Sequence, residues 1–301
     1  MNEKINKLTS ADEERDSENV PPRKDTKQHW FAKLGKDQGK LASPIDINLT
    51  YTVPLQLEPL EWQFLDSPPK KIKLTNTGHT LQVSAYWNDQ KPIITGGPFA
   101  SAFEFSQLHF HWGAVDMEGS EHTVDGVKYP LEMHVVFFKS EYKTHQAALK
   151  ERDGIAVLVY LFKLHAQPNI LMDYIVSKLT LISDPLDSVR LNSIPLHFFL
   201  NKFEEDYYLY WGSIETSKSI HTISWLICRE PIGITCEEME GIRVMFNLKN
   251  EPMLQNFREV RPLGERSVFH VCPSGIKYSS MLPTPKANNE MLSVLETLLA
   301  E

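Results

Sequence analysis

Apolar and polar residues alternate along several short stretches of the chain, which predicts β-strands. Residues 72–76 and 81–87 both alternate, and the turn residues between them predict that the two strands pair. Residues 222–228 and 244–247 are also strand-like. Residues 154–162 form a nearly continuous apolar run, which is typical of a strand that is buried on both faces.

Helical periodicity is rarer. Residues 171–179 carry apolar side chains at helical spacing and predict a short helix. Residues 288–301 predict an amphipathic helix with Asn289 as its N-cap. Its apolar side is formed by four leucines: Leu292, Leu295, Leu298 and Leu299. Many short strands with few helices favour a single, sheet-dominated α+β domain.

Composition divides the chain into three parts. Residues 1–28 are dense in charged residues and predict a disordered leader. Residues 29–270 form the predicted domain, and residues 271–301 form a linker followed by the C-terminal helix. Two roles for that helix stay open: it docks on the domain's own surface, or it binds a protein partner through residues 288–301.

Bulk properties narrow the functional classes. The 301 residues are 42% hydrophobic, which is enough for a sizeable core. A net charge of −8 without a basic stripe argues against a nucleic-acid partner. No apolar run reaches the ~18 residues that span a membrane, and the charged N-terminus is not a secretory signal. Three cysteines without Cys-x-x-Cys spacing favour a reducing compartment, so we expect a cytoplasmic protein.

Three histidines lie within strand-like runs. His109 and His111 are two residues apart, so the period of a strand places both imidazoles on one face. His134 lies in a second run, residues 133–138, which can pair antiparallel beside the first. Three neutral imidazoles that converge on one point are a ligand set for Zn2+ with an open fourth position. The alternative is that they are hydrogen-bonded core residues, and spacing alone does not decide between the two.

Three motifs resemble the signature of the alpha-class carbonic anhydrases: Leu-His-Phe-His-Trp-Gly at 108–113, Gly-Ser-Glu-His-Thr-Val-Asp at 119–125 and Glu-Met-His-Val-Val at 132–136. The resemblance continues in one register from His29 to Arg266. It implies a large, mostly antiparallel twisted sheet with short surface helices. It also implies Zn2+ as cofactor, held by the three histidines, and carbon dioxide and bicarbonate as small-molecule substrates.

The resemblance implies roles for residues around the metal as well. Gln107, Glu132 and the carbonyl of Asn256 accept hydrogen bonds from the ring N–H groups of the three ligands. Glu121 matches a buried Glu that orients the attacking water through an intermediate hydroxyl; the alternative is a surface turn carboxylate. His79 matches a position at which members of the family carry a proton-shuttle His, and an imidazole can relay a proton near neutral pH; the alternative is an exposed turn His without a role. The implied apolar substrate pocket has five members: Val136, Val157, Ile214, Ile223 and Trp225.

One position departs from the family pattern. Glu215 replaces the Thr whose hydroxyl lies one hydrogen bond, about 2.7 Å, from the attacking water. A Glu side chain reaches further and ends in an anion, so it can bind the zinc directly and close the tetrahedral site. Two other outcomes keep the fourth position open: Glu215 turns toward Lys218 or solvent, or Thr216 takes the bridging role.

The sequence therefore leaves competing functions. We expect a zinc-dependent lyase of the carbonate dehydratase type that hydrates carbon dioxide reversibly, at a rate reduced by Glu215. The alternative is a catalytically silent, carbonic-anhydrase-related binding protein whose zinc is closed off by Glu215. A third interpretation is a zinc-stabilised interaction module that acts through the C-terminal helix.

Overall fold

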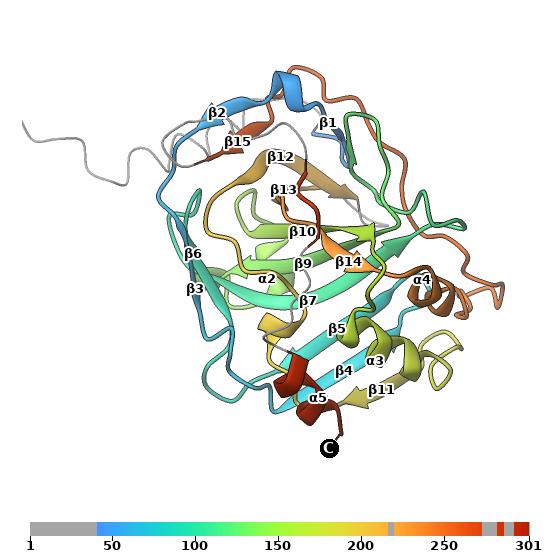
Figure 1. Cartoon of the computed structure of the whole chain (residues 1–301). Helices are drawn as coiled ribbons and strands as arrows, with labels where there is room; N and C mark the ends of the chain where they lie inside the picture. The colour runs from blue at the N-terminus through green and yellow to red at the C-terminus, as the bar shows by residue number, and fades with distance from the viewer. Residues whose placement is uncertain (1–40, 216–219, 273–281, 286–291, 301) are drawn as a thin grey trace, which may run out of the picture.

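The computed structural model describes residues 41–215, 220–272, 282–285 and 292–300 (Figure 1). The strands within these ranges are β1 (Asp46–Ile47), β2 (Val53–Leu55), β3 (Leu60–Gln63), β4 (Lys71–Asn76), β5 (Leu81–Tyr86), β6 (Ile93–Gly96), β7 (Phe103–Trp112), β8 (Thr123–Val124), β9 (Leu131–Lys139), β10 (Ile155–Leu164), β11 (Ser188–Leu191), β12 (Tyr207–Glu215), β13 (Ile220–Cys228), β14 (Ile232–Ile234) and β15 (Phe269–Val271). The helices are α2 (His145–Ala148), α3 (Ile170–Leu179), α4 (Cys236–Ile242) and α5 (Leu292–Ala300), with 3-10 turns η1 (Leu49–Tyr51), η2 (Ser140–Tyr142) and η3 (Leu196–Phe198). The predicted leader, residues 1–28, lies outside the described residues.

A single large sheet organises the molecule. Its main path runs β11-β4-β5-β7-β9-β10-β13-β12-β15-β2, and β3, β6 and β14 pair beside it. Most neighbouring strands are antiparallel, whereas β10 pairs with β13 and β14, and β15 with β2, in parallel. Strands β1 and β8 form a separate two-stranded sheet. The predicted sheet-dominated α+β fold is thus confirmed.

The core lies on both faces of this sheet. Strand β9 shows how: Met133, Val135 and Phe137 belong to one hydrophobic cluster, and Val136 and Phe138 belong to the other. Both faces of β9 are covered, so its side chains up to Phe138 are buried and its sequence lacks polar alternation. A polar side chain in this strand therefore has to find its partners inside the protein.

Several predicted elements are confirmed. Strands β4 and β5 pair antiparallel, and β10 and β13 cover the runs predicted at 154–162 and 222–228. Helix α3 matches the helix predicted at 171–179, and the Asn169 side chain caps it by accepting a hydrogen bond from the Met172 N–H.

The strand predicted at residues 244–247 is wrong. These residues form a loop after α4, and Phe246 makes only an isolated bridge to Pro252. Met245 is fully buried while Val244 is exposed, so the apolar run reflects one side chain inserted into the core from a loop. The prediction also missed α4, whose N-cap Thr235 and Glu238 form a capping box.

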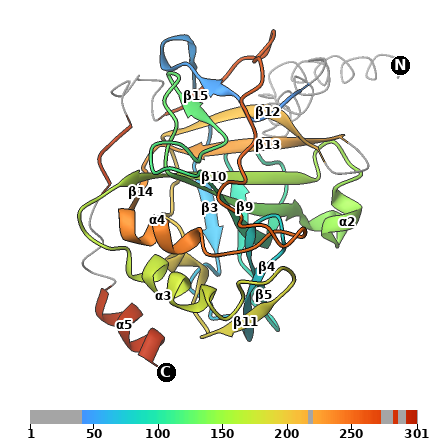
Figure 2. The same cartoon turned by 90° about the vertical axis from the view of Figure 1, so that its right-hand side faces the viewer.

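The C-terminal segment returns to the domain. Leu295 is buried in the core cluster that contains Met133, Leu299 packs against that cluster, and the Asn192 side chain donates to the Leu298 carbonyl at 2.8 Å. Helices α3, α4 and α5 gather at one side of the molecule (Figure 2). The helix predicted at 288–301 is present over Leu292–Ala300, and its Leu295 and Leu299 face the domain; its predicted cap, Asn289, lies outside the described residues. Among the described residues, no helix has the length and apolar character needed to cross a membrane.

Candidate metal centre

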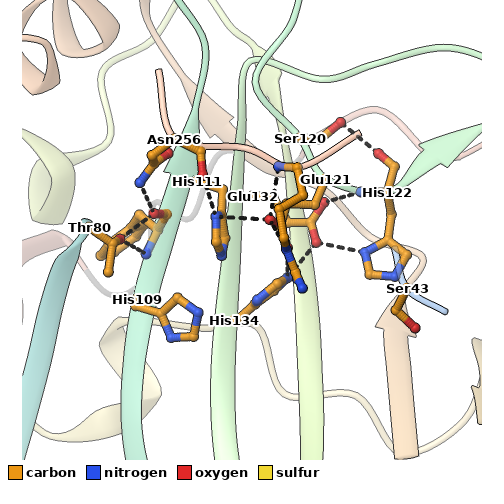
Figure 3. Close-up of polar contacts among 12 residues, drawn as sticks. Ser43, Thr80, His109, His111, Ser120, Glu121, His122, Glu132, His134 and Asn256 are labelled. Atoms are coloured by element: carbon orange, nitrogen blue, oxygen red, sulfur yellow. Dashed lines mark hydrogen bonds and ion pairs between the residues drawn. The ribbon is translucent and has the colours of Figure 1, made fainter. Parts of the chain in front are cut away.

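Two neighbouring strands bring the three histidines together. His109 and His111 lie on β7, and His134 lies directly opposite His109 on β9. The ring centroids of His109 and His111, and of His109 and His134, are 5.1 Å apart, and those of His111 and His134 are 4.6 Å apart. One ligand atom from each residue lies within 4.8 Å of the other two. Figure 3 shows the three rings gathered across the strands, as the spacing of the histidines predicts.

The hydrogen bonds of these rings leave two nitrogens without a partner. The Nδ1 of His109 bonds to Gln107 Oε1 at 3.0 Å, and the Nε2 of His134 bonds to Glu132 Oε1 at 2.5 Å. The Nδ1 of His111 lies 3.3 Å from the carbonyl oxygen of Asn256 (Figure 3). All three predicted hydrogen bonds are therefore present. The remaining nitrogens of His111 and His134 are buried and have no hydrogen-bond partner in the described part of the chain.

Buried nitrogens without partners are costly unless something else binds them. Burial lowers the pKa of His109 well below its usual value, and the neighbouring His111 and His134 lower it further. Burial also lowers the pKa of His111 to about 4, although Glu121 opposes the change. Both rings are consequently neutral at pH 7, the form that binds a metal ion. The donor set fits Zn2+, for which three histidines and an open position are a common catalytic arrangement.

A second group of potential ligands, His122, Glu132 and His134, overlaps the first. Both nitrogens of His122 are engaged: Nδ1 bonds to Glu132 Oε1 at 2.7 Å, and Nε2 bonds to the Tyr210 hydroxyl at 2.6 Å. The Tyr210 hydroxyl in turn donates to Ser43 Oγ at 3.1 Å. His122 therefore holds Glu132 in place beneath His134 rather than offering a nitrogen to a metal.

Glu132 carries the charge of this network. Burial alone would raise its pKa, but His122 and His134 outweigh burial and hold the pKa well below the usual range. The backbone N–H of His122 also donates to Glu132 Oε2 at 2.8 Å. A carboxylate that accepts this many hydrogen bonds stays ionised and fixes the ring orientation of His134.

Glu121 is fully buried, so the surface-carboxylate alternative is wrong. Its carboxylate is clamped by Arg258: the Arg258 Nε donates to Oε1 at 2.7 Å, Nη2 donates to Oε2 at 2.5 Å, and the backbone N–H donates to Oε1 at 3.1 Å. The Nδ1 of His111 is 3.3 Å from the same Oε1. Burial would raise the pKa of Glu121, but His111 and Arg258 outweigh it and lower the pKa to about 2.

A cavity of about 980 Å³ opens onto the histidines. His79, in the turn between β4 and β5, is exposed and lines this cavity together with His109 and His111. The Asn256 side chain ties the turn to β7, because its Nδ2 donates both to the His79 carbonyl at 3.1 Å and to the Phe110 carbonyl at 2.9 Å. The structure thus places an exposed imidazole at the rim of the cavity onto which the half-buried rings of His109 and His111 open.

The five residues predicted to form an apolar pocket come together in one cluster. Val136, Val157, Ile223 and Trp225 are buried in it, and Ile214 packs against it. The Trp225 ring is 5.0 Å from the His134 ring, so this cluster adjoins the candidate metal centre. Its members come from β9, β10, β12 and β13, which are neighbours in the sheet.

Glu215, the residue that departs from the family pattern, is the last residue of a described range. Strand β12 ends at Glu215, whose backbone pairs with that of Ile220. The Glu215 side chain, Thr216 and Lys218 lie outside the described residues, so the predictions about their roles stay predictions.

Arg258 and His122 are site residues to which the sequence analysis gives no role. Arg258 lies two positions after Asn256, in a stretch of the chain without regular secondary structure. Its nearness in sequence to Asn256 is a local signal for its place at the site. Its partner Glu121 is 137 positions away, so the ion pair itself had no local signature.

Comparison with known proteins agrees with the geometry. The model of the eukaryotic-type carbonic anhydrase family matches residues 25–272. Carbonic anhydrase 3 of Bos taurus is 30% identical over 254 residues, covering 80% of this chain and 93% of the relative. Carbonic anhydrase 1 of Monodelphis domestica is 32% identical over 254 residues with the same coverage. The family match and the folded site together show that this chain belongs to the eukaryotic-type carbonic anhydrases.

Proposed function

We propose that this protein binds Zn2+ through His109, His111 and His134 and hydrates carbon dioxide reversibly to bicarbonate and a proton. The observation that carries the proposal is the pair of buried ring nitrogens, on His111 and His134, that have no hydrogen-bond partner among the described residues. When bound, zinc supplies Lewis acidity that lowers the pKa of a water molecule to about 7, the value characteristic of carbonic anhydrases, and so provides the nucleophile.

The chain's own residues supply orientation, a dry pocket and a route for the proton. Gln107, Glu132 and the Asn256 carbonyl fix the ring orientations. The apolar cluster around Trp225 suits carbon dioxide, which is small and uncharged. His79 carries the released proton from the cavity to buffer, because it is exposed at the rim. Glu121, fixed by Arg258, orients the attacking water through a bridging group.

Glu215 reduces the rate in this proposal. It stands where the family has a Thr that links the buried Glu to the attacking water, and its carboxylate competes for the fourth zinc position. The second candidate function is a silent binding protein in which that competition is complete. Thr216 in the bridging role, or Glu215 turned toward Lys218, favours the enzyme instead.

Metal analysis and a hydration assay on the same purified protein test the proposal. We expect one zinc per chain, and hydration above the buffer rate that disappears with a chelator and returns with zinc. One zinc without hydration supports the silent alternative, and absence of stoichiometric metal overturns both. An X-ray structure with data collected at the zinc edge identifies the fourth ligand, which is water in the enzyme and Glu215 in the silent protein.

We further propose a cytoplasmic location, supported by three cysteines that are free in the structure. The proposed small-molecule partners are carbon dioxide and bicarbonate. A protein partner for residues 288–301 has less support, because Leu295 is already buried against the chain's own domain.

A further inference from the structure

A second cavity, of about 250 Å³, lies behind the candidate metal centre, on the opposite face of the sheet. Phe110 and Met133 form part of its wall, and they are paired neighbours on β7 and β9. Phe110 stands between His109 and His111, and Met133 precedes His134, so strand alternation directs both side chains away from the histidines. This cavity is therefore separated from the candidate metal centre by the sheet itself.

Much of the wall of this back cavity is apolar and aromatic, and the rest carries polar side chains, among them His165, Gln167 and His197. Phe162 of β10, Leu171 and Ile175 of α3, and Leu295 of α5 join Phe110 and Met133 around it. No described residue that lines the cavity is a Lys, Arg, Asp or Glu. A charged ligand would lose its hydration here without gaining a counter-charge, so the lining selects an uncharged molecule.

Two of the polar residues at the cavity are already hydrogen-bonded. The Asn169 Oδ1 accepts from the Met172 N–H at 3.2 Å, and its Nδ2 donates to the Gly233 carbonyl at 3.2 Å. The Asn201 carbonyl accepts from the Tyr160 hydroxyl at 2.8 Å. A ligand needs no polar group to complete these hydrogen bonds, and the apolar part of the wall supplies its contact surface.

Helix α5 supplies a wall from outside the matched family region. The family match ends at residue 272, whereas α5 spans Leu292–Ala300. Leu295 reaches the cavity, and the hydrogen bond from Asn192 to the Leu298 carbonyl holds the helix beside α3. The cavity is thus completed by a segment that the family model does not include.

We infer that the back cavity is a binding site for a small, uncharged aromatic molecule about the size of a single ring. Protein interiors leave few voids larger than a water molecule, and an apolar cavity of about 150 Å³ already accepts benzene. The back cavity exceeds that volume, and the rings of Phe110 and Phe162 offer surfaces for an aromatic partner. The inference does not depend on zinc or on the hydration reaction.

Methionine methyl NMR on the full-length protein tests the inference with benzene as the probe. Met133 and Met172 line the cavity, whereas the buried Met239 and Met245 do not and serve as internal references. We expect benzene to shift the methyl signals of Met133 and Met172 saturably and to leave the references unchanged. Benzoate, which has the same ring with a carboxylate, is expected to shift neither signal.

A pair of variants on α5 sharpens the test. Leu295→Trp fills the cavity and is expected to weaken benzene binding at least tenfold. Glu296→Trp, at the next and exposed position, adds the same ring outside and is expected to bind as the parent does. The inference is overturned if Met133 and Met172 do not respond up to the solubility limit of benzene, or if benzoate moves them equally. If Leu295→Trp does not fold, the benzene titration of the parent protein decides by itself whether the back cavity binds benzene.

Discussion

Single residues at the candidate metal centre differ in how far the sequence could predict them. The three histidines could be predicted from the sequence because two of them share a strand face and the third lies in the adjacent run. Their acceptors Gln107 and Glu132 each lie two positions before a ligand on the same strand, which is again a local pattern. The clamp between Glu121 and Arg258 was not predicted, because it joins two segments that only the folded sheet brings together.

Replacing Glu215 by Thr tests the proposal that Glu215 limits the rate. In that proposal, the change restores a hydroxyl at the bridging position and removes a carboxylate that competes for the fourth zinc position. We expect the turnover number for carbon dioxide hydration to rise by about two orders of magnitude or more, the scale on which positioned catalytic groups act. Stopped-flow hydration assays on zinc-loaded protein measure the change.

Glu215→Gln is the matched control for this prediction. The amide keeps the length of the side chain but removes its charge, so it competes weakly for zinc and does not restore the bridging hydroxyl. We expect an increase smaller than that of Glu215→Thr. A folded, zinc-loaded Glu215→Thr protein with unchanged turnover would contradict the assigned role.

His79→Ala tests the proton route. Once Glu215→Thr has made the chemical step fast, we expect proton removal to limit turnover and His79→Ala to lower the turnover number by about one to two orders of magnitude in weak buffer. Added imidazole buffer should restore most of the loss, because it replaces the missing proton carrier. Equal losses in weak buffer and in concentrated imidazole would argue that His79 acts only in packing or folding.

At the scale of elements, pairing between strands positions the site more than any single strand does. The β7–β9 register places His109 opposite His134 and His111 opposite Glu132, so a shift by one residue would turn the ligands to the wrong face. Both runs were predicted from composition. The strand predicted at 244–247 is wrong because the sequence of a loop that buries one residue can resemble the sequence of a strand over four positions.

Helix α4 links the start of helix α3 to the end of β7, the strand that carries His109 and His111. Its C-cap residue Arg243 donates to the Gly113 carbonyl at 2.8 Å and to Asp116 Oδ1 at 2.7 Å, just beyond the end of β7. At the other end, Glu238 accepts from the Asn169 N–H at the start of α3. The helix was missed, although its capping box was visible as Thr235 followed three positions later by Glu238.

Thr235→Ala tests the contribution of this cap. The side chain of Thr235 accepts from the Glu238 N–H at 3.2 Å, and Ala leaves that donor without its partner. We expect the free energy of unfolding in urea to fall by about 1 kcal/mol, as is typical for a lost N-cap. Thr235→Ser keeps the hydroxyl and should retain most of the stability. A loss as large in Ser as in Ala would show that the Thr methyl group, not the cap, is responsible.

At the scale of the whole molecule, the fold class could be predicted and the strand order could not. Alternation and turn residues identify strands one at a time. The parallel pairing of β10 with β13 joins residues about 70 positions apart, and nothing local in either run specifies it. The return of α5 to the domain was one of two roles left open for the C-terminal helix, since an amphipathic helix suits either.

One ion-pair cluster joins three segments of the chain, at the ends of β12, β13 and β15. Asp206, just before β12, accepts from Arg229 after β13 at 2.8 Å and bonds to His270 of β15 at 2.7 Å. Burial would raise the pKa of Asp206, but His270 and Arg229 outweigh it and lower the pKa. A carboxyl whose pKa is lower in the folded state stabilises the fold above its unfolded pKa of 3.8. That contribution is lost as the pH falls from 3.8 through the lowered folded value.

Asp206→Asn should therefore destabilise the protein at neutral pH and much less in acid. The backbone at Asp206 has φ 61°, which Asn also tolerates, so the change removes charge with little strain. We expect a loss of about 1–2 kcal/mol at pH 7, below the range for fully buried pairs because 36% of the Asp206 side chain is exposed. Urea unfolding at pH 7, 5, 4 and 3 should show the gap to the parent shrinking only below about pH 4.

The comparison of parent and variant isolates this one carboxyl. If zinc is bound as proposed, its loss in acid lowers the stability of both proteins equally and cancels in the difference between them. Asp89→Asn, at an exposed position, should leave the unfolding free energy within about 0.5 kcal/mol of the parent at every pH. A gap between Asp206→Asn and the parent that stays constant from pH 7 to pH 3 would mean that the variant loses packing rather than charge. In that case the cluster would not be the ion-paired link that holds β12, β13 and β15 together at this edge of the sheet.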